Sequence, residues 1–318
     1  MSTPTSNESG RLAAARYGKD KIRVFRVVRE PAPSKVHHIV EYIVTALVEG
    51  DFDTSFTQAD NSVVVATDSI KNITYYLAKT SPHVLDPTRF ALHLGTVLVS
   101  KYAHLHRAYI TVQQLRWARI DESGAPHTHA FWRDGDEKKV VRAEIEKLAA
   151  GKLTARVAAG LSDLLVLKTT GSAFENFVRD EFTTLLEVSD RIFSTSVDLT
   201  YRFKPLTINV GGAGDGLELL EEWVEGREKG SAWDGEEVAK AARQTTLEVF
   251  ATDESASVQA TLYKMGQALL AHHSQLDNVS YSLPNKHYIP VDMRYINEDN
   301  LTPLVAAPRF RKSLACTD

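Results

Sequence analysis

The residues best placed for chemistry follow a short apolar run near the start of the chain. Residues 63–65 are three valines, and Thr67, Asp68 and Ser69 come shortly after them. The β-branched valines favour a buried strand, and Thr67 and Asp68 are typical of the N-cap that begins a helix. Such a junction directs backbone N–H groups and a hydroxyl toward a ligand that is anionic or forms hydrogen bonds. Helix capping alone would use the same residues, so the spacing leaves both interpretations open.

Two histidine pairs offer a different chemistry. His104 and His106 are separated by one residue, as are His127 and His129. Histidines at this spacing lie on the same face of a strand, and zinc sites use such pairs. The alternative is that the four imidazoles are partly buried and hydrogen-bonded within a hairpin. A clear third ligand is missing from the sequence around both pairs.

Hydrophobic periodicity places these residues in a chain of mixed strands and helices. Apolar alternation or continuous apolar runs predict strands, and apolar residues at +3 and +4 spacing predict helices. The predicted strands cover residues 22–28, 40–48, 63–65, 109–120, 129–133, 138–145, 164–168, 191–203, 279–282 and 288–293. The predicted helices follow Asp68 and Asp86 and span residues 236–250 and 258–269. Strand pair, helix pair and strand pair thus occur twice, which predicts an α+β fold of two similar domains with antiparallel sheets.

Composition narrows the class of protein. Hydrophobic residues make up 43% and charged residues 25% of the 318 positions, which is typical of globular proteins. The net charge of -4 disfavours nucleic acid as a partner, and no apolar stretch approaches the length of a membrane span. The lone Cys316 excludes an internal disulfide, and the first ten residues lack a signal-peptide core. We therefore expect a protein of a reducing compartment that binds neither nucleic acid nor membrane.

Four separated motifs resemble the urate oxidase (uricase) family, in consistent order. They are Tyr17-Gly18-Lys19-Asp20, residues 59–72, Ser257-Val258-Gln259-Ala260-Thr261 and residues 282–288. The resemblance implies two tandem tunnelling-fold domains, here at residues 17–147 and 148–310. An insertion at about residues 211–235 and loose tails at residues 1–16 and 311–318 complete the expected division. It also implies a barrel-like homotetramer with active sites at the subunit interfaces.

The activity implied by the resemblance belongs to purine degradation. It is the oxidation of urate by O₂ and water to 5-hydroxyisourate and hydrogen peroxide, without a metal or an organic cofactor. The family's catalytic groups fall on Lys19, Thr67 and His287, with Lys19 as a base whose pKa is lowered in a closed, partly apolar site. The family's substrate-binding residues fall on Thr67, Asp68, Phe174, Leu185, Arg191, Val258, Gln259 and Asn285.

The chemistry of urate suits these positions. Urate is a planar anion, so a guanidinium fork and an amide can hold one edge in its plane while an aromatic ring stacks on its face. The resemblance assigns these roles to Arg191, Gln259 and Phe174, and assigns to Asn285 the placing of water or O₂ above the ring. Taken singly, each residue has a structural alternative: a core phenylalanine, a surface ion pair, an exposed glutamine.

Two rival functions and the location of the protein stay open at this point. One rival is a zinc-dependent tunnelling-fold enzyme that acts on a pterin or a purine through the histidine pairs. The other is a purine-binding paralogue without turnover, which the presence of Lys19, Thr67 and His287 disfavours. The family implies a peroxisome, but the chain ends Ala315-Cys316-Thr317-Asp318 in place of a Ser-Lys-Leu-type signal, so the cytoplasm is the alternative.

Overall fold

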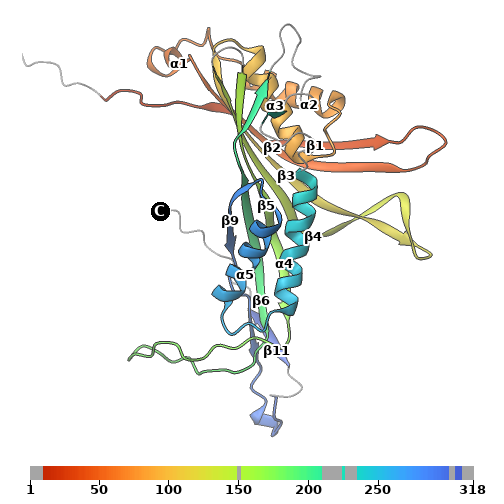
Figure 1. Ribbon diagram of the computed structural model, residues 1–318, viewed down its shortest axis with the longest axis vertical. Coiled ribbons are helices and arrows are strands. Elements are labelled where there is room, and N and C mark those ends of the chain that lie inside the picture. Colours follow the sequence, from red (N-terminus) through yellow and green to blue (C-terminus); the bar gives the residue numbers. More distant parts are fainter. Residues whose placement is uncertain (1–9, 149–151, 210–223, 226–234, 301–304, 310–318) are drawn as a thin grey trace, which may run out of the picture. The chain divides into compact units, whose positions relative to one another are not determined.

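The computed structural model describes residues 10–148, 152–209, 224–225, 235–300 and 305–309 (Figure 1). The strands are β1 (Tyr17–Arg29), β2 (His37–Gly50), β3 (Leu105–Glu122), β4 (Ala125–Lys147), β5 (Lys152–Lys168), β6 (Phe193–Phe203), β7 (Leu206–Asn209), β8 (Val224–Glu225), β9 (Leu276–Ser282), β10 (His287–Pro290) and β11 (Ala306–Arg309). The α-helices are α1 (Asp53–Thr57), α2 (Thr67–Thr80), α3 (Pro87–Lys101), α4 (Gly235–Thr252) and α5 (Val258–His272). None of the described helices is long and apolar enough to cross a membrane.

The sheet follows the order β1-β2-β3-β4-β5-β6-β9, with β7 pairing with β5 and with β8. Strands β1 and β2, β5 and β6, and β6 and β9 pair antiparallel. Strands β10 and β11 form a separate antiparallel pair. Each strand predicted from the sequence, apart from residues 63–65, overlaps one of these strands. The antiparallel α+β class is thereby confirmed.

The chain divides into two compact units that are not successive in sequence. The first includes residues 1–113, 141–157 and 205–233, and the second includes residues 114–140, 158–204 and 234–318. Strands β3, β4 and β5 contribute residues to both units. The domain division at residues 147 and 148 stays a prediction, as do the tails and the insertion. Residues 1–9, residues 311–318 and most of the insertion lie outside the described residues. Residues 10–16 form neither helix nor strand.

The first unit buries one face of the β1–β2 hairpin under α2 and α3. Side chains of β2 alternate, and its inner set is fully buried because successive residues of a strand point to opposite faces. Helix α3 begins as predicted at Asp86, whose side chain accepts from the backbone N–H groups of Thr88 and Arg89 at 2.8 and 3.2 Å. Proline at the first helical position fits this start, because its missing N–H has no partner there in any helix. The inner set of β2 is Tyr42, Val44, Ala46 and Val48.

The predicted strand at residues 63–65 is wrong. Val63 lies in a turn and Val64 and Val65 follow it, and of the three valines Val65 alone is buried. The hydroxyl of Tyr17 accepts from the Val65 N–H at 2.7 Å and donates to its carbonyl at 3.1 Å. A side chain therefore satisfies the backbone that a neighbouring strand would otherwise satisfy. The N-cap of α2 is Ala66 rather than Thr67 or Asp68, and both of those residues lie inside the helix.

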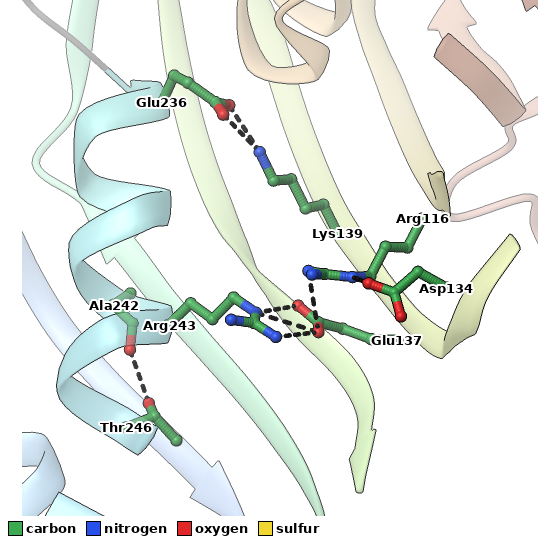
Figure 2. Close-up of polar contacts among 8 residues, drawn as sticks. All are labelled: Arg116, Asp134, Glu137, Lys139, Glu236, Ala242, Arg243 and Thr246. Carbon is green, nitrogen blue, oxygen red and sulfur yellow. Dashed lines mark hydrogen bonds and ion pairs between the residues drawn. The ribbon is translucent and has the colours of Figure 1, made fainter. Parts of the chain in front are cut away.

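The second unit packs α4 and α5 against its strands. The ring of Phe193, at the start of β6, lies 5.4 Å from that of Phe250 near the end of α4. Figure 2 shows how charged side chains tie α4 to β4: Arg243 donates to the carboxylate of Glu137 at 2.9, 3.1 and 3.0 Å. Arg116 reaches the same carboxylate at 3.3 Å. Glu137 is buried, so this bidentate pair fixes the helix on the sheet as well as neutralising the carboxylate.

Candidate functional site

Lys19 projects from a β-bulge in β1. The pairing of β1 with β2 shifts between Lys19 and Ile22, and Lys21 takes a left-handed φ of 55°. Gly18 is required just before it, because a Cβ at that position would meet the Ala46 carbonyl oxygen at 2.0 Å. Lys19 itself is exposed. The closed, partly apolar surroundings expected for a lysine base are thus not supplied by the described part of this chain.

The structure brings Lys19 close to the start of α2. The charge of Lys19 contributes to lowering the pKa of Asp68, although the larger cause is the hydrogen bond from Lys71 at 2.6 Å. Asn72 donates to the other oxygen of Asp68 at 2.9 Å. Thr67 is the first residue of α2 and is exposed, and the first N–H groups of a helix have no partner within the helix. These residues all belong to the first unit.

Phe174 and Arg191 form the centre of the site in the second unit. The guanidinium carbon of Arg191 lies 5.2 Å from the centre of the Phe174 ring. Phe174 pairs with Val188 through two backbone hydrogen bonds of 2.8 and 3.0 Å, and the Arg191 N–H donates to the Ser172 carbonyl at 2.8 Å. Burial lowers the pKa of Arg191, and its Nε is buried without a hydrogen-bond partner among the described residues. A buried N–H of this kind is suited to an in-plane acceptor on a ligand.

Backbone hydrogen bonds join this pair to the start of α5. Ala173 donates to the carbonyl of Ser255 at 2.9 Å, and Ser255 donates to the carbonyl of Gly171 at 3.0 Å. Ser257 is the N-cap of α5, and Val258 and Gln259 are its first residues. Gln259 is exposed, and its Oε1 accepts from the Ser257 hydroxyl at 2.9 Å. The segments that carry Phe174, Arg191 and Gln259 are therefore one hydrogen-bonded assembly.

Asn285 lies between β9 and β10, and His287 is the first residue of β10. Asn285 forms an antiparallel bridge with Thr195 of β6, and the hydroxyl of Thr195 donates to the Pro284 carbonyl at 3.0 Å. Both Asn285 and His287 are exposed. Thr195 follows Arg191 by four residues, so β6 connects this segment to the aromatic and guanidinium pair.

Leu185 belongs to an exposed segment, rich in apolar side chains, in the loop between Phe174 and Val188. It is 53% exposed, and the neighbouring Val178, Phe182 and Leu186 are exposed to 91, 82 and 75%. Single exposed apolar residues are ordinary, but four within nine residues form a patch of the kind that contacts another molecule. The structure does not bring Leu185 against Phe174.

The histidine pairs do not form the arrangement expected of a metal site. His104 lies in the turn before β3, and His106 is hydrogen-bonded to Asp51 at 2.8 Å. The rings of His127 and His129 lie 4.6 Å apart, but the Nδ1 of His127 accepts from backbone N–H groups at 3.2 and 3.1 Å. Within the described ranges, no group of three or more His, Cys, Asp or Glu residues could hold a metal ion.

Three residues with a role in this geometry were not selected from the sequence. Tyr17 positions Val65, Asp190 accepts hydrogen bonds from the turn before Phe174, and Ser255 joins that turn to α5. The Ser-Asp-Arg and Ser-Ala-Ser runs contain the short polar side chains that favour turns, which is a signal for local structure only. Their partners lie far away in the chain, and periodicity does not report such pairs.

An antiparallel sheet with paired helices, matched by a family model in two successive segments, defines a two-repeat tunnelling-fold protein. The model is that of the uricase family, and it matches residues 15–144 and 157–309. This chain belongs to the uricase family.

Known uricases are similar in sequence to this chain over most of their length. A uricase from Emericella nidulans is 44% identical over 284 residues, which cover 89% of this chain and 87% of the relative. A uricase from Cyberlindnera jadinii is 36% identical, with 96% of each chain covered. The crystal structure of uricase from Arthrobacter globiformis superposes with a TM-score of 0.76 at 31% identity, over 95% of this chain and 92% of that one.

Proposed function

We propose that this chain catalyses the oxidation of urate by O₂ and water to 5-hydroxyisourate and hydrogen peroxide. The observation that carries the proposal is the Arg191–Phe174 pair, joined by backbone hydrogen bonds to the first turn of α5. Phe174 is a ring of the kind on which a flat purine stacks, and in this chain it already stacks on the ring of Phe177 with centroids 4.8 Å apart. The guanidinium and the Gln259 amide offer in-plane donors. Membership of the uricase family supports the same substrate.

Lys19 and Thr67, which supply the proton chemistry, belong to the first unit, whereas Asn285 and His287 belong to the second. Lys19 removes a proton from bound urate, Thr67 passes it on, and His287 with Asn285 holds the oxygen species or water that reacts with the ring. The electron-rich urate anion reduces O₂ to peroxide, and water then adds to the oxidised ring, so that the products account for both oxygen atoms of O₂ and for the added water. Deprotonation by the lysine requires that its ammonium be desolvated in the working site.

We further propose that the working enzyme is a homotetramer with active sites at its subunit interfaces. Two observations support this. Lys19 is exposed on the single chain although a base needs to be shielded from water, and four apolar side chains are exposed among residues 178–186, in the loop between Phe174 and Val188. Sedimentation velocity should give a mass four times that of the chain. A monomer with full activity would contradict this proposal.

The activity itself is tested by mixing the purified protein with urate in air. Loss of the purine's ultraviolet absorbance and appearance of peroxide are followed together, with and without a chelator. Because the proposed reaction uses neither metal nor organic cofactor, we expect equal rates in both samples and one peroxide for each urate. No turnover would contradict the function, and turnover abolished by the chelator and restored by metal would contradict the cofactor-free mechanism.

A further inference from the structure

Asp190 stands directly before Arg191, and its carboxylate holds the turn that precedes Phe174. The hydroxyl of Thr170 donates to one carboxylate oxygen at 2.6 Å. The N–H groups of Gly171 and Ser172 donate to the other at 2.8 and 3.5 Å. These hydrogen bonds, with that of Thr170 the largest cause, lower the pKa of Asp190, so the carboxylate is charged at neutral pH. One side chain thus gathers several consecutive donors of a single turn.

The turn needs such a partner because of its conformation. Gly171 takes a left-handed φ of 75°, which directs successive N–H groups toward the same side. The chain then continues through Ser172, whose carbonyl accepts from the Arg191 N–H at 2.8 Å, to Phe174. Asp190 therefore accepts from the N–H groups of the turn, while the N–H of its neighbour Arg191 donates to a carbonyl of the same turn. Phe174 and Arg191 are held in register by this closed loop of hydrogen bonds.

We propose that Asp190 is a positioning residue for the substrate clamp, defined as Phe174, Arg191 and Gln259. The inference rests on the proposed function, since it assigns to Asp190 the alignment of groups that hold urate. Asp190 acts through the turn at residues 170–172: when the turn is fixed, the Phe174 ring stays beneath the Arg191 guanidinium. It contributes to binding without being a catalytic residue.

The same turn is also hydrogen-bonded to the segment that leads into α5. Gly171 accepts from Ser255 and Ala173 donates to it, so a displaced turn would move the segment that leads into Ser257 and Gln259. The hydroxyl of Thr261, which is buried, donates to the carboxylate of Asp253 at 2.6 Å and is hydrogen-bonded to the hydroxyl of Ser255 at 2.8 Å, and so holds that segment on the helix. Loss of Asp190 should therefore loosen both sides of the clamp together.

The test compares Asp190→Ala with Asp190→Asn. Asparagine keeps an oxygen that accepts from the turn's N–H groups and places an NH₂ donor near the Thr170 hydroxyl, which can accept. We expect Asp190→Ala to raise the KM for urate about tenfold or more, with kcat within about threefold, because interactions shared by the bound substrate and the transition state are lost. Asp190→Asn should return KM to within about threefold of the parent value.

Asp292→Ala is the matched control. Asp292 also accepts from a backbone N–H two residues on, that of Arg294 at 3.1 Å, in an exposed part of the same unit. We expect this variant to leave KM and kcat unchanged. An equal rise in KM for the control would assign the effect to general loosening of the unit and overturn the inference.

Hydrogen–deuterium exchange gives a readout that does not depend on urate. Peptides that cover residues 169–175 should exchange faster in Asp190→Ala than in the parent, and at the parent rate in Asp190→Asn and Asp292→Ala. Unchanged exchange and KM in Asp190→Ala would overturn the inference, and so would a failure of Asp190→Asn to restore them, since charge rather than hydrogen bonding would then be responsible. If Asp190→Ala does not fold, Thr170→Val removes one donor and should give a smaller change of the same kind.

The outcomes separate this inference from the proposed function. A parent enzyme that does not oxidise urate would contradict the function, while the exchange experiment would still test the turn. An active parent with an unaffected Asp190→Ala variant would contradict the inference alone.

Discussion

The guanidinium of Arg191 lies 5.2 Å from the centre of the Phe174 ring, and the two residues are linked through the backbone of Ser172. A cation over an aromatic ring is attracted to its face, so this contact holds the side chain before a ligand enters. The arrangement presents the planar fork next to the surface on which a purine would stack. The geometry of binding is thus prepared by groups within a single unit.

Arg191→Lys should weaken urate binding strongly. Lysine keeps the charge and loses the planar fork, so kcat/KM should fall by about a hundredfold, which is the size expected when a bidentate contact is lost. Steady-state kinetics check this. The control is Arg179→Lys, because Arg179 lies 5.3 Å from the Phe177 ring in a similar contact outside the clamp. Equal losses in both variants would show that the contact, rather than the clamp, is responsible.

Lys19→Met should separate binding from turnover. Methionine fills a similar length without an amine, so we expect a urate-like inhibitor to bind within about threefold of the parent affinity while kcat falls by at least about a hundredfold. Calorimetry and the peroxide assay measure the two quantities. Lys21→Met serves as the control, since Lys21 is an exposed lysine of the same bulge. Retained turnover in Lys19→Met would rule out this lysine as the base.

Arg243→Met should destabilise the protein. It leaves the buried Glu137 carboxylate with Arg116 alone, and removal of one partner from a buried ion pair costs about 3 kcal/mol. Thermal unfolding at fixed protein concentration should show a clearly lower Tm. Arg23→Met is the control, because Arg23 is 68% exposed in its pair with Glu41 and such pairs contribute at most about 1 kcal/mol. Equal shifts would contradict a special role for the Glu137 cluster.

His93 should make stability depend on pH. Burial, and to a lesser degree His83, lower the pKa of His93 to about 4 from an ordinary 6.5. The unfolded chain therefore binds the proton first. Stability from neutral His93 is complete above pH 6.5 and falls as the pH drops toward 4, by up to about 3 kcal/mol.

The measurement is Tm between pH 8 and pH 5 for the parent and for His93→Gln. Between pH 8 and pH 5 the Tm of the parent should fall further than the Tm of the variant, because the variant has no titrating group at that position. His272→Gln, at an exposed histidine, should follow the parent. Parallel curves for the parent and His93→Gln would contradict the prediction.

Much of the fold is predictable because its signals are local. The start of helix α3 is predicted by Asp86 and Pro87. The turn between β3 and β4 is predicted by Ser123 and Gly124, and both residues take a left-handed φ in the structure. Residues 63–65 are the exception. Their β-branched side chains suggest a strand, but the partner that satisfies Val65 is the hydroxyl of Tyr17, 48 residues earlier.

The site divides along the same line. Motif resemblance supplies the positions of Phe174, Arg191 and Gln259, and their roles stay predictions. The sequence does not reveal that Ser255 joins the first two to the third, because a bridge between distant turns leaves no periodic pattern. Nor does it predict that Lys19 is exposed, because exposure depends on which elements cover β1.

The link between the turn at residues 171–173 and Ser255 consists of backbone groups alone. Exchanging the side chains that face the ligand would leave those hydrogen bonds in place. A directed-evolution library at Phe174 and Gln259 would therefore sample binding sites for rings of other shapes while the backbone hydrogen bonds stay unchanged. The proposed clamp would, in this respect, be a starting point for enzymes that oxidise other flat heterocycles.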